Sequence, residues 1–530
     1  MLDASTNFLQ CTAKSFLRPG ERKKTCECPE KHRSRRGCGH MEETMANLSG
    51  KSGPRDGGLY NEDLAPIPAS ERKWGAFEIF NVWNNDIQSL FGYTLAASLF
   101  ITYGLNGWMV FAAIVLAGFF VMVLVNLTGR PSVKHGVPYP VIARASMGVY
   151  GARFPALVRG IVAIFWYGVQ TYFASTAVAL LFNTLLGTEG GAEFLGMTTV
   201  GWISYLIVCV FQVALFMKGI DWVGKFLNWA GPFVYIVMIA LCLVIWWKAG
   251  NGIFSALGTI FEGSEATDPR GPVAAFVAVV GTMIAYFAAV VINFGDFSRF
   301  VSDERAMKRG NFWGLPVSMA FFSFIALFVT AGTVVLFGEK LVNPADIVDR
   351  VDNVLLTLIA AVTFFAATVG INLVANFIPP AYDIANLNPE KISARTGGII
   401  TAVIAFFIGA LWVSVISNIG IAAFVDTLDA FLAPLYGILV ADYYLVRKQN
   451  IDVEALFSSD PDARYHYNNG WNMKAIFAFA IAALFSVATV WVPALSELSG
   501  YGWVIGAVLG GVLHLGLMRL QTTEAGKTAQ

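Results

Sequence analysis

The chain has 530 residues, of which 56% are hydrophobic and only 14% are charged, and its 36 basic and 36 acidic side chains leave no net charge at pH 7. A soluble protein of this length carries about 25% charged residues, so this composition and a mean hydropathy of +0.61 exclude an ordinary soluble domain. The balanced charge gives no sign of a nucleic-acid partner.

The N-terminal tail, residues 1–70, is rich in charge and glycine, which predicts a disordered cytoplasmic segment without a cleaved signal peptide. Four of the six cysteines lie in it, at Cys11, Cys26, Cys28 and Cys38. Their spacing fits no familiar zinc motif, so we predict a reduced tail that holds no metal. Met41 and Met45 are alternative starts, which leaves open whether residues 1–40 belong to the native protein.

Twelve apolar segments follow the tail, each close to the ~20 residues that cross a bilayer. They lie at roughly 80–103, 108–127, 156–186, 199–217, 226–247, 272–295, 312–337, 353–378, 398–416, 419–446, 473–493 and 500–520. If the N-terminus is cytoplasmic, nearly all Lys and Arg side chains of the loops, Arg144 and Arg159 among them, fall on the cytoplasmic side. We therefore predict an all-α protein with twelve transmembrane helices in the cytoplasmic membrane, with both termini, including a tail at 521–530, in the cytoplasm.

Polar side chains lie inside two of these apolar segments. The third segment carries Trp166 and, one helical turn later, Gln170, while the eighth carries Asn376. Buried amides in a membrane cost free energy unless they face a partner, a cavity or a substrate. An indole that stacks and amides that hydrogen-bond are what a pocket for a small, flat, uncharged heterocycle needs. The pattern favours a transporter, although a Trp in a membrane helix is also commonly a packing residue.

The first and sixth segments contain features that interrupt a helix. The first opens with a polar run at 84–89 followed by Gly92, and the sixth contains Gly281 and ends with Asn293 and Asp296. Broken helices at corresponding positions of two five-helix halves point to a substrate site near the middle of the membrane. The two halves show no clear residue-level repeat, so sequence similarity alone does not establish an inverted repeat.

A series of motifs runs along the chain in a characteristic order. They are NEDLAP at 61–66, HGVPYP at 135–140, RASMG at 144–148, WYGVQ at 166–170, NFGDFSRF at 293–300, PAYDIAN at 380–386 and ADYYLVRK at 441–448. Together they resemble the nucleobase:cation symporter-1 family, which includes hydantoin, allantoin, uracil and cytosine permeases. The resemblance covers roughly residues 60–520. It implies a leucine-transporter-like fold, with a five-plus-five inverted repeat at 71–447 and two additional transmembrane helices at 448–520.

The same resemblance implies which residues bind the cargo. They are Trp166, Gln170, Phe287, Asn376 and either Gln88 or Ser89. Trp166 and Phe287 would stack on the ring, while the amides and the first-helix residue would hydrogen-bond its edges. Each hydrogen bond contributes only about 1 kcal/mol, yet an unmatched buried amide costs about 1–3 kcal/mol, so the edge pattern sets selectivity.

The eighth segment departs from the sodium-coupled members of that family. Two adjacent hydroxyl residues of those members are replaced here by Gly370 and Ile371, close to Ala367. A hard cation needs oxygen ligands, and this site would lose two of about five. Sodium coupling through these positions is therefore not expected.

Protons are the expected replacement for sodium. Asp86 enters the first span, and Asp426 and Asp429 lie in the tenth. A carboxylate at the bilayer centre costs about 2.5–3.5 kcal/mol, so such a residue commonly has a function or a partner. We hypothesise proton coupling through one of the three, with uncoupled uptake, or carboxylates that merely face water, as the alternatives.

The sequence thus predicts a permease that imports a nucleobase or a hydantoin- or allantoin-type ring by alternating access, without a cofactor or metal. An enzyme is not expected, because His514 is the only histidine in a span and has no catalytic partner. An amino-acid transporter of the same fold is the alternative. It would hold a carboxylate at helix N-termini, whereas paired aromatic and amide side chains favour a neutral ring.

Overall fold

The computed structural model describes residues 58–187, 191–259, 271–339, 341, 344–350, 353–498 and 500–528. The predicted disorder of the tail up to residue 57, its four cysteines and the choice of start codon lie outside the described residues. Residues 58–70 do not behave as the end of a disordered tail, because Leu59 and Leu64 are buried in a small apolar cluster with Val137 and Val141. The tail boundary at residue 70 was therefore set too late, since two isolated leucines in a polar stretch give little sequence signal.

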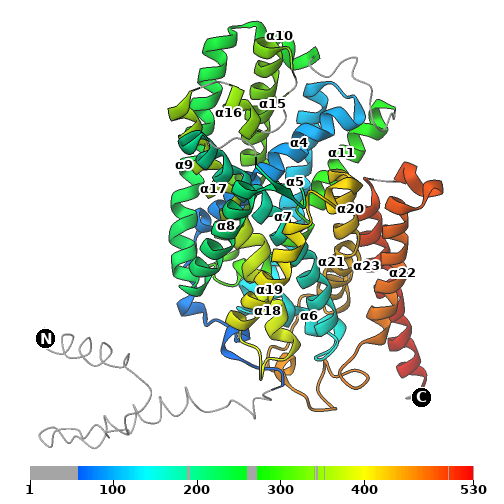
Figure 1. The fold of residues 1–530 in the computed structure, drawn as a ribbon. Coiled ribbons are helices and arrows are strands. Elements are labelled where there is room, and N and C mark those ends of the chain that lie inside the picture. Colours follow the sequence, from blue (N-terminus) through cyan, green and yellow to red (C-terminus); the bar gives the residue numbers. More distant parts are fainter. Residues whose placement is uncertain are drawn as a thin grey trace, which may run out of the picture. The chain divides into compact units, whose positions relative to one another are not determined.

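The described chain is helical apart from one short antiparallel hairpin of β1 (Glu193–Phe194) and β2 (Met197–Thr198). The α-helices, shown in Figure 1, are α3 (Ala76–Ile87), α4 (Leu90–Tyr103), α5 (Gly107–His135), α6 (Tyr139–Met147), α7 (Arg153–Leu186), α8 (Thr199–Met217), α9 (Ile220–Ala249), α10 (Gly252–Thr259), α11 (Pro272–Tyr286), α12 (Ala288–Asn293), α13 (Gly295–Ser298), α14 (Glu304–Phe312), α15 (Ser318–Phe337), α16 (Pro344–Arg350), α17 (Val354–Ile371), α18 (Ile378–Leu387), α19 (Ala394–Ala410), α20 (Ile421–Ala430), α21 (Leu432–Ala441), α22 (Met473–Trp491) and α23 (Gly502–Thr528). Wider π-helical turns are η3 (Trp313–Val317), η4 (Asn372–Phe377) and η6 (Asp442–Val446). Short 3-10 turns are η1 (Glu62–Leu64), η2 (Ala69–Glu71), η5 (Ile416–Ile419), η7 (Ala455–Phe457) and η8 (Pro493–Leu498).

Eight helices in the described part of the chain are long and apolar enough to cross a membrane, or nine if one bent pair counts as a span. That pair, Ala423–Ala430 and Leu432–Val446, is bent by 40°. The all-α membrane prediction is confirmed. This count by length is lower than the predicted twelve, because the segments expected at 80–103, 272–295 and 398–416 form broken or shorter helices.

The first predicted span breaks where its polar run ends. α3 ends at Ile87 and α4 begins at Leu90. Ser89 has an extended backbone, and its Oγ accepts a hydrogen bond from the Gly92 amide at 2.8 Å, as an N-cap does. A serine that caps a new helix therefore explains why the span is interrupted here.

The sixth and eighth spans are also irregular. Phe287 separates α11 from α12, and the π-helical η4 is followed by Pro379 and Pro380. Proline has no amide N–H, so these two residues leave carbonyls of the preceding turn, that of Ala375 among them, without their helical donors. Wide turns of this kind are frequent at functional sites.

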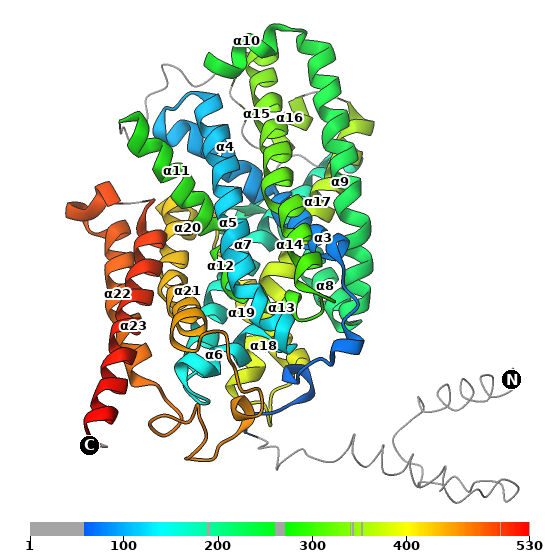
Figure 2. The ribbon, with the colours of Figure 1, turned by 180° about the vertical axis from the view of Figure 1, so that it is seen from behind.

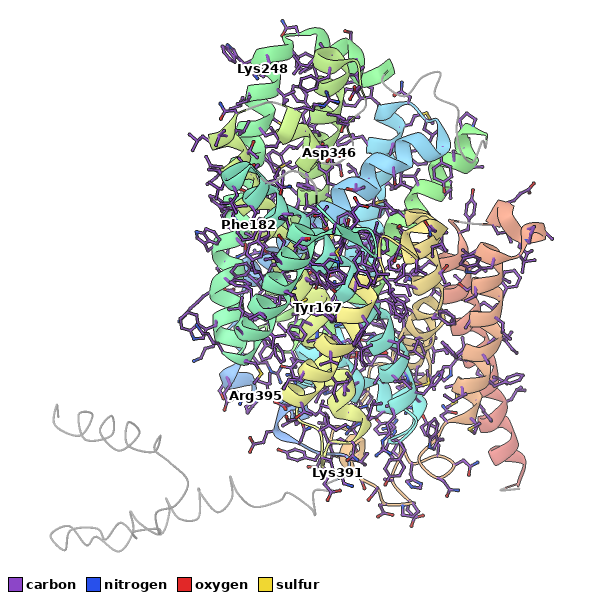
Figure 3. The ribbon with its side chains drawn as sticks, in the orientation of Figure 1. Tyr167, Phe182, Lys248, Asp346, Lys391 and Arg395 are labelled. Atoms are coloured by element: carbon purple, nitrogen blue, oxygen red, sulfur yellow. The ribbon has the colours of Figure 1, made fainter. Side chains whose placement is uncertain are left out.

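The helix α7 runs through the bundle and packs against α17, η4 and α18 as well as α8 and α19. Tyr167, near its middle, lies between one end of the bundle, marked by Lys248, and the other, marked by Lys391 and Arg395 (Figure 3). Residues 58–75 and the C-terminal end of α23 lie at that second end (Figure 2). α7 therefore packs against the interrupted eighth span, which consists of α17, η4 and α18.

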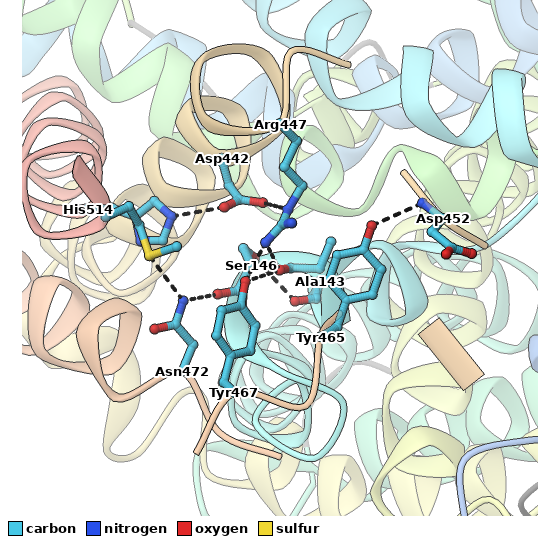
Figure 4. Close-up of polar contacts among 11 residues, drawn as sticks. Ala143, Ser146, Asp442, Arg447, Asp452, Tyr465, Tyr467, Asn472 and His514 are labelled. Carbon is cyan, nitrogen blue, oxygen red and sulfur yellow. Dashed lines mark hydrogen bonds and ion pairs between the residues drawn. The ribbon is translucent and has the colours of Figure 1, made fainter. Parts of the chain in front are cut away.

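The helix α23 is joined to the rest of the bundle by a buried polar cluster (Figure 4). Asp442 accepts a hydrogen bond from Arg447 Nε at 2.5 Å and lies 3.1 Å from His514 Nε2. Arg447 and the Tyr467 hydroxyl both donate to the Ala145 carbonyl. His514 is thus a structural link between α23 and η6.

Candidate substrate site

A small cavity with a buried lining lies beside the middle of α7. Its lining consists of Asp86, Trp166, Gln170, Tyr286, Ala289, Val290, Ile371, Ala375 and Asn376. The residues predicted to bind a ring from α7 and from η4 are therefore brought together, although they lie far apart in the sequence. The cavity encloses about 10 Å³, close to the space that one water molecule needs, so a ring enters only if lining side chains move.

Trp166 forms an aromatic wall of the cavity. Its indole packs edge-on against the rings of Phe91 and Tyr286, at centroid distances of 5.0 Å and 5.7 Å. Its Nε1 interacts with the Asp429 carboxyl on α20. The indole N–H therefore has a partner within the protein, and the face of the ring is what Trp166 offers to a cargo.

Phe287, predicted as the second stacking residue, does not line the cavity. It is buried behind it, edge-on to Trp83 at 6.3 Å and adjacent to Tyr286. Tyr286 lines the cavity instead, with its hydroxyl 3.2 Å from Ser89 Oγ. The side chains of consecutive helix residues point about 100° apart, so Tyr286 and Phe287 cannot both face the cavity. The exact position of the break between α11 and α12 decides which of these two rings faces it.

Of the two candidates in the first helix, Ser89 is the one that contacts residues lining the cavity. Gln170 Nε2 lies 3.4 Å from Ser89 Oγ, the same oxygen that contacts Tyr286. Gln88 points elsewhere and donates from Nε2 to Asn84 Oδ1 at 3.0 Å. Within the described residues, Gln170 Oε1 has no hydrogen-bond donor, which leaves it available as an acceptor.

Asn376 is held in place by a second amide one turn earlier. Its Nδ2 donates to Asn372 Oδ1 at 3.1 Å. Asn372 Nδ2 donates in turn to Gln212 Oε1 on α8 at 2.8 Å and to the Tyr167 carbonyl on α7 at 3.1 Å. Asn372 and Gln212 are not among the residues predicted from the sequence, although each is an amide inside an apolar span.

Arg159 bonds to the backbone of two residues that line the cavity. This fully buried side chain lies seven residues before Trp166, about 10 Å along α7. Its Nη2 donates to the carbonyls of Ala375 at 2.8 Å and Ala289 at 3.4 Å, and both of these residues line the cavity. Its Nη1 lies 3.7 Å from Asp383 Oδ2 on α18. The guanidinium therefore replaces the donor that the two prolines remove and ties η4 to α12, whereas the sequence analysis had counted it as a loop residue.

Two of the three predicted carboxyl groups flank the aromatic wall. Asp86 lines the cavity, and Asp429 on α20 is fully buried beside Trp166 and Asp426. Both lie close to Tyr286. Among the described residues, none donates a hydrogen bond to Asp86 Oδ2, and the Trp166 indole is the side chain that interacts with the Asp429 carboxyl. Buried carboxyls with so few donors are costly when charged and are suited to carry a proton.

The positions of the expected degenerate sodium site are packed by a neighbouring side chain. A Cβ on Gly370 would lie 2.5 Å from Asn85 Oδ1. The Asn85 Nδ2 donates to the carbonyls of Asn81 at 2.8 Å and Leu227 at 3.3 Å. Ile371 lines the cavity with an apolar side chain, and Ala367 is buried. In the described ranges, no cluster of His, Cys, Asp or Glu could hold a metal ion.

Comparison with known proteins decides the family. Residues 66–506 match the family described as permeases for cytosine/purines, uracil, thiamine and allantoin. The chain belongs to the nucleobase:cation symporter-1 family. An allantoin permease of Bacillus subtilis is 34% identical over 471 residues, which cover 87% of this chain and 94% of the relative. A putative allantoin permease of Escherichia coli is 29% identical and covers 88% of this chain and 96% of its own length.

This symporter-1 family member also shares its fold with a solved structure. Mhp1, a nucleobase-cation-symport-1 family transporter in a closed conformation with bromovinylhydantoin bound, superposes with a TM-score of 0.72. The identity is 23%, and the match covers 87% of this chain and 96% of Mhp1. The family and these relatives are permeases, so the chain is a multi-pass membrane transporter and not an enzyme.

Proposed function

We propose that the chain imports a small, flat, uncharged heterocycle, a hydantoin- or allantoin-type ring or a nucleobase. The observation that carries this proposal is the convergence of Trp166, Gln170 and Asn376 on one cavity. An indole face and two amides that approach from different helices can stack a ring and read its edges. The relatives named as allantoin permeases and the hydantoin bound by Mhp1 support the same cargo class.

Transport would occur by alternating access around this cavity. A small cavity of about 10 Å³ and a buried arginine that ties η4 to α12 suit a central site that opens to one side at a time. The proposal includes twelve spans, a five-plus-five inverted repeat at 71–447 and two additional helices at 448–520. Broken helices at α3/α4 and α11/α12, one in each proposed half, support that arrangement.

We further propose that the protein resides in the cytoplasmic membrane with both termini inside. The end of the bundle at which residues 58–75 and the end of α23 lie also carries Lys391 and Arg395 (Figures 2 and 3). Positively charged loops stay on the cytoplasmic side, so this end would face the cytoplasm.

Uptake is proposed to be coupled to protons rather than to sodium. The hydroxyl ligands are replaced at Gly370 and Ile371, and Asn85 packs against Gly370. Asp86 and Asp429 offer buried carboxyls beside the cavity, with Asp426 next to Asp429. A proton on either carboxyl would remove a charge that the membrane interior disfavours.

The experiment is a ligand panel on the purified full-length protein, read as thermal stabilisation in sodium and in potassium buffers. The panel contains uracil, cytosine, allantoin, hydantoin, hypoxanthine and leucine. Stabilisation by one of the rings, equal in both salts, is the expected result, because a ligand that binds the folded state raises Tm. A larger shift in sodium would contradict the coupling proposal. Stabilisation by leucine alone would replace the ring permease with an amino-acid transporter of the same fold.

A further inference from the structure

We propose that Asn372 sets the orientation of the Asn376 amide, so that Asn376 offers its oxygen to the cargo and selects rings with an N–H at that edge. The proposal rests on the proposed function, because it concerns how the same cavity chooses among heterocycles. Asn372 and its partner Gln212 do not line the cavity, so both act as positioning residues.

The orientation follows from the Tyr167 backbone carbonyl, which can only accept a hydrogen bond. One end of the Asn372 side chain lies 3.1 Å from this carbonyl oxygen, so that end is the NH2 group and the other end is Oδ1. Asn376 meets this Oδ1 at 3.1 Å, and it must therefore present its own NH2 group there. Asn376 lines the cavity, and its Oδ1 is the acceptor that it can offer there.

Two further side chains fix the same assignment. The Thr171 hydroxyl donates to the Tyr167 carbonyl at 2.6 Å, so its oxygen can accept from Gln212 Nε2 at 3.1 Å. Gln212 Oε1 then accepts from Asn372 Nδ2 at 2.8 Å, while Asn372 Nδ2 also lies 3.0 Å from the Thr171 oxygen. All four residues are buried, and a reversed Asn372 would place its oxygen against the Tyr167 carbonyl, which cannot donate. Unmatched polar groups at such a depth are costly, so the relay holds one orientation.

The cavity consequently presents side-chain oxygens to the ring from two helices. Asn376 Oδ1 comes from η4 and Gln170 Oε1 from α7, while the Trp166 indole supplies a stacking face. A ring with an N–H toward Asn376 satisfies its oxygen, and the same ring methylated at that nitrogen leaves it unmatched. We expect the wild type to prefer the N–H ring by about 10- to 100-fold.

The test compares allantoin with 1-methylallantoin and 3-methylallantoin, with binding measured on the full-length protein. Asn372→Leu removes the oxygen that holds Asn376. Asn372→Asp, which is protonated at this depth, keeps an oxygen toward Asn376 and an O–H toward the Tyr167 carbonyl. The preference for the N–H ring is expected to disappear in Asn372→Leu and to survive in Asn372→Asp. A purely structural role would weaken all three ligands equally. An unchanged preference in Asn372→Leu would overturn the proposal.

Asn311→Leu is the matched control, because Asn311 is a buried amide that links Trp83 to Asn126 away from the cavity lining. It should lower Tm without changing the ratio of affinities.

A ligand-free measurement separates this proposal from the proposed function. This measurement is the free energy of unfolding of Asn372→Ala, Asn376→Ala and the double variant. If the two side chains are hydrogen-bonded, the double variant should lose less stability than the sum of the two single losses. If none of the rings binds, the proposed function fails. Independently of ligand binding, additive losses of stability would overturn the proposal that Asn372 orients Asn376.

Discussion

Asn85 Oδ1 lies 2.5 Å from the position that a Cβ on Gly370 would occupy. A side chain of the first helix thus fills space at the point where the sodium-coupled pattern has a hydroxyl group on the eighth. The same side chain donates to the carbonyls of Asn81 and Leu227, which links α3 to α9. Asn85 therefore provides a polar contact between α3 and α9 in this chain.

Gly370→Ser should clash with Asn85 and lower the free energy of unfolding by about 1–3 kcal/mol, the usual cost of overpacking. Adding Asn85→Ala should recover part of that loss, as measured by chemical or thermal unfolding. Gly224→Ser is the control, because a Cβ there meets nothing within 4 Å. A Gly370→Ser variant as stable as the wild type would mean that Asn85 does not fill this site.

Neutralising the buried carboxyls should abolish the dependence of uptake on a proton gradient. We expect Asp86→Asn or Asp429→Asn to permit exchange of cargo across vesicle membranes without accumulation driven by low external pH. Asp462→Asn, on an exposed loop, should leave accumulation unchanged. If Asp86→Asn, Asp429→Asn and Asp426→Asn all retain pH-driven accumulation, proton coupling through these residues is wrong.

Trp166→Leu should remove the stacking face and weaken cargo binding by about 2- to 12-fold, because aromatic stacking contributes about 0.5–1.5 kcal/mol beyond the area that the ring buries. Trp166→Phe keeps a ring but loses the N–H, so an intermediate affinity is expected. Affinities can be measured by isothermal titration. The control is Trp247→Leu, where the side chain is 84% exposed. Equal affinities of wild type and Trp166→Leu would place the cargo elsewhere.

Arg159→Lys should slow transport more than it weakens binding. A lysine ammonium cannot reproduce the planar guanidinium that reaches two carbonyls and Asp383 together, so the backbone at the cavity should lose its order. We expect the maximal rate of uptake into proteoliposomes to fall about tenfold or more, with a change of less than about threefold in cargo Kd. Arg144→Lys is the matched control, since Arg144 is equally buried but bonds to the Leu59 carbonyl and Asn386. A similar fall in both variants would contradict a role for Arg159 at the cavity.

The sequence was sufficient to predict the polar residues that stand out against an apolar background. Trp166, Gln170 and Asn376 were identifiable because an amide or indole inside a membrane span needs a reason to be there. Asp86 stood out for the same cause. The structure brings these four residues to one cavity, although their roles in binding and coupling stay predictions.

Other features depended on geometry that sequence patterns do not contain. The helix break at Phe287 turns Tyr286 into the cavity, and a shift of one residue cannot be read from spacing. Arg159 was taken for a loop cation, because its partners are backbone carbonyls freed by prolines far along the chain. Gln88 and Ser89 were equivalent in the sequence until a cap at α4 separated them.

The most direct test of the proposed function is uptake of radiolabelled allantoin into proteoliposomes that contain the wild type or Trp166→Leu. The wild type should accumulate allantoin when the outside is acidic, without a requirement for sodium, and the variant should not. Uptake should be blocked by excess unlabelled hydantoin, which has the same ring. Failure of the wild type to move any ring compound, or equal uptake by Trp166→Leu, would contradict the assignment of this cavity as the transport site.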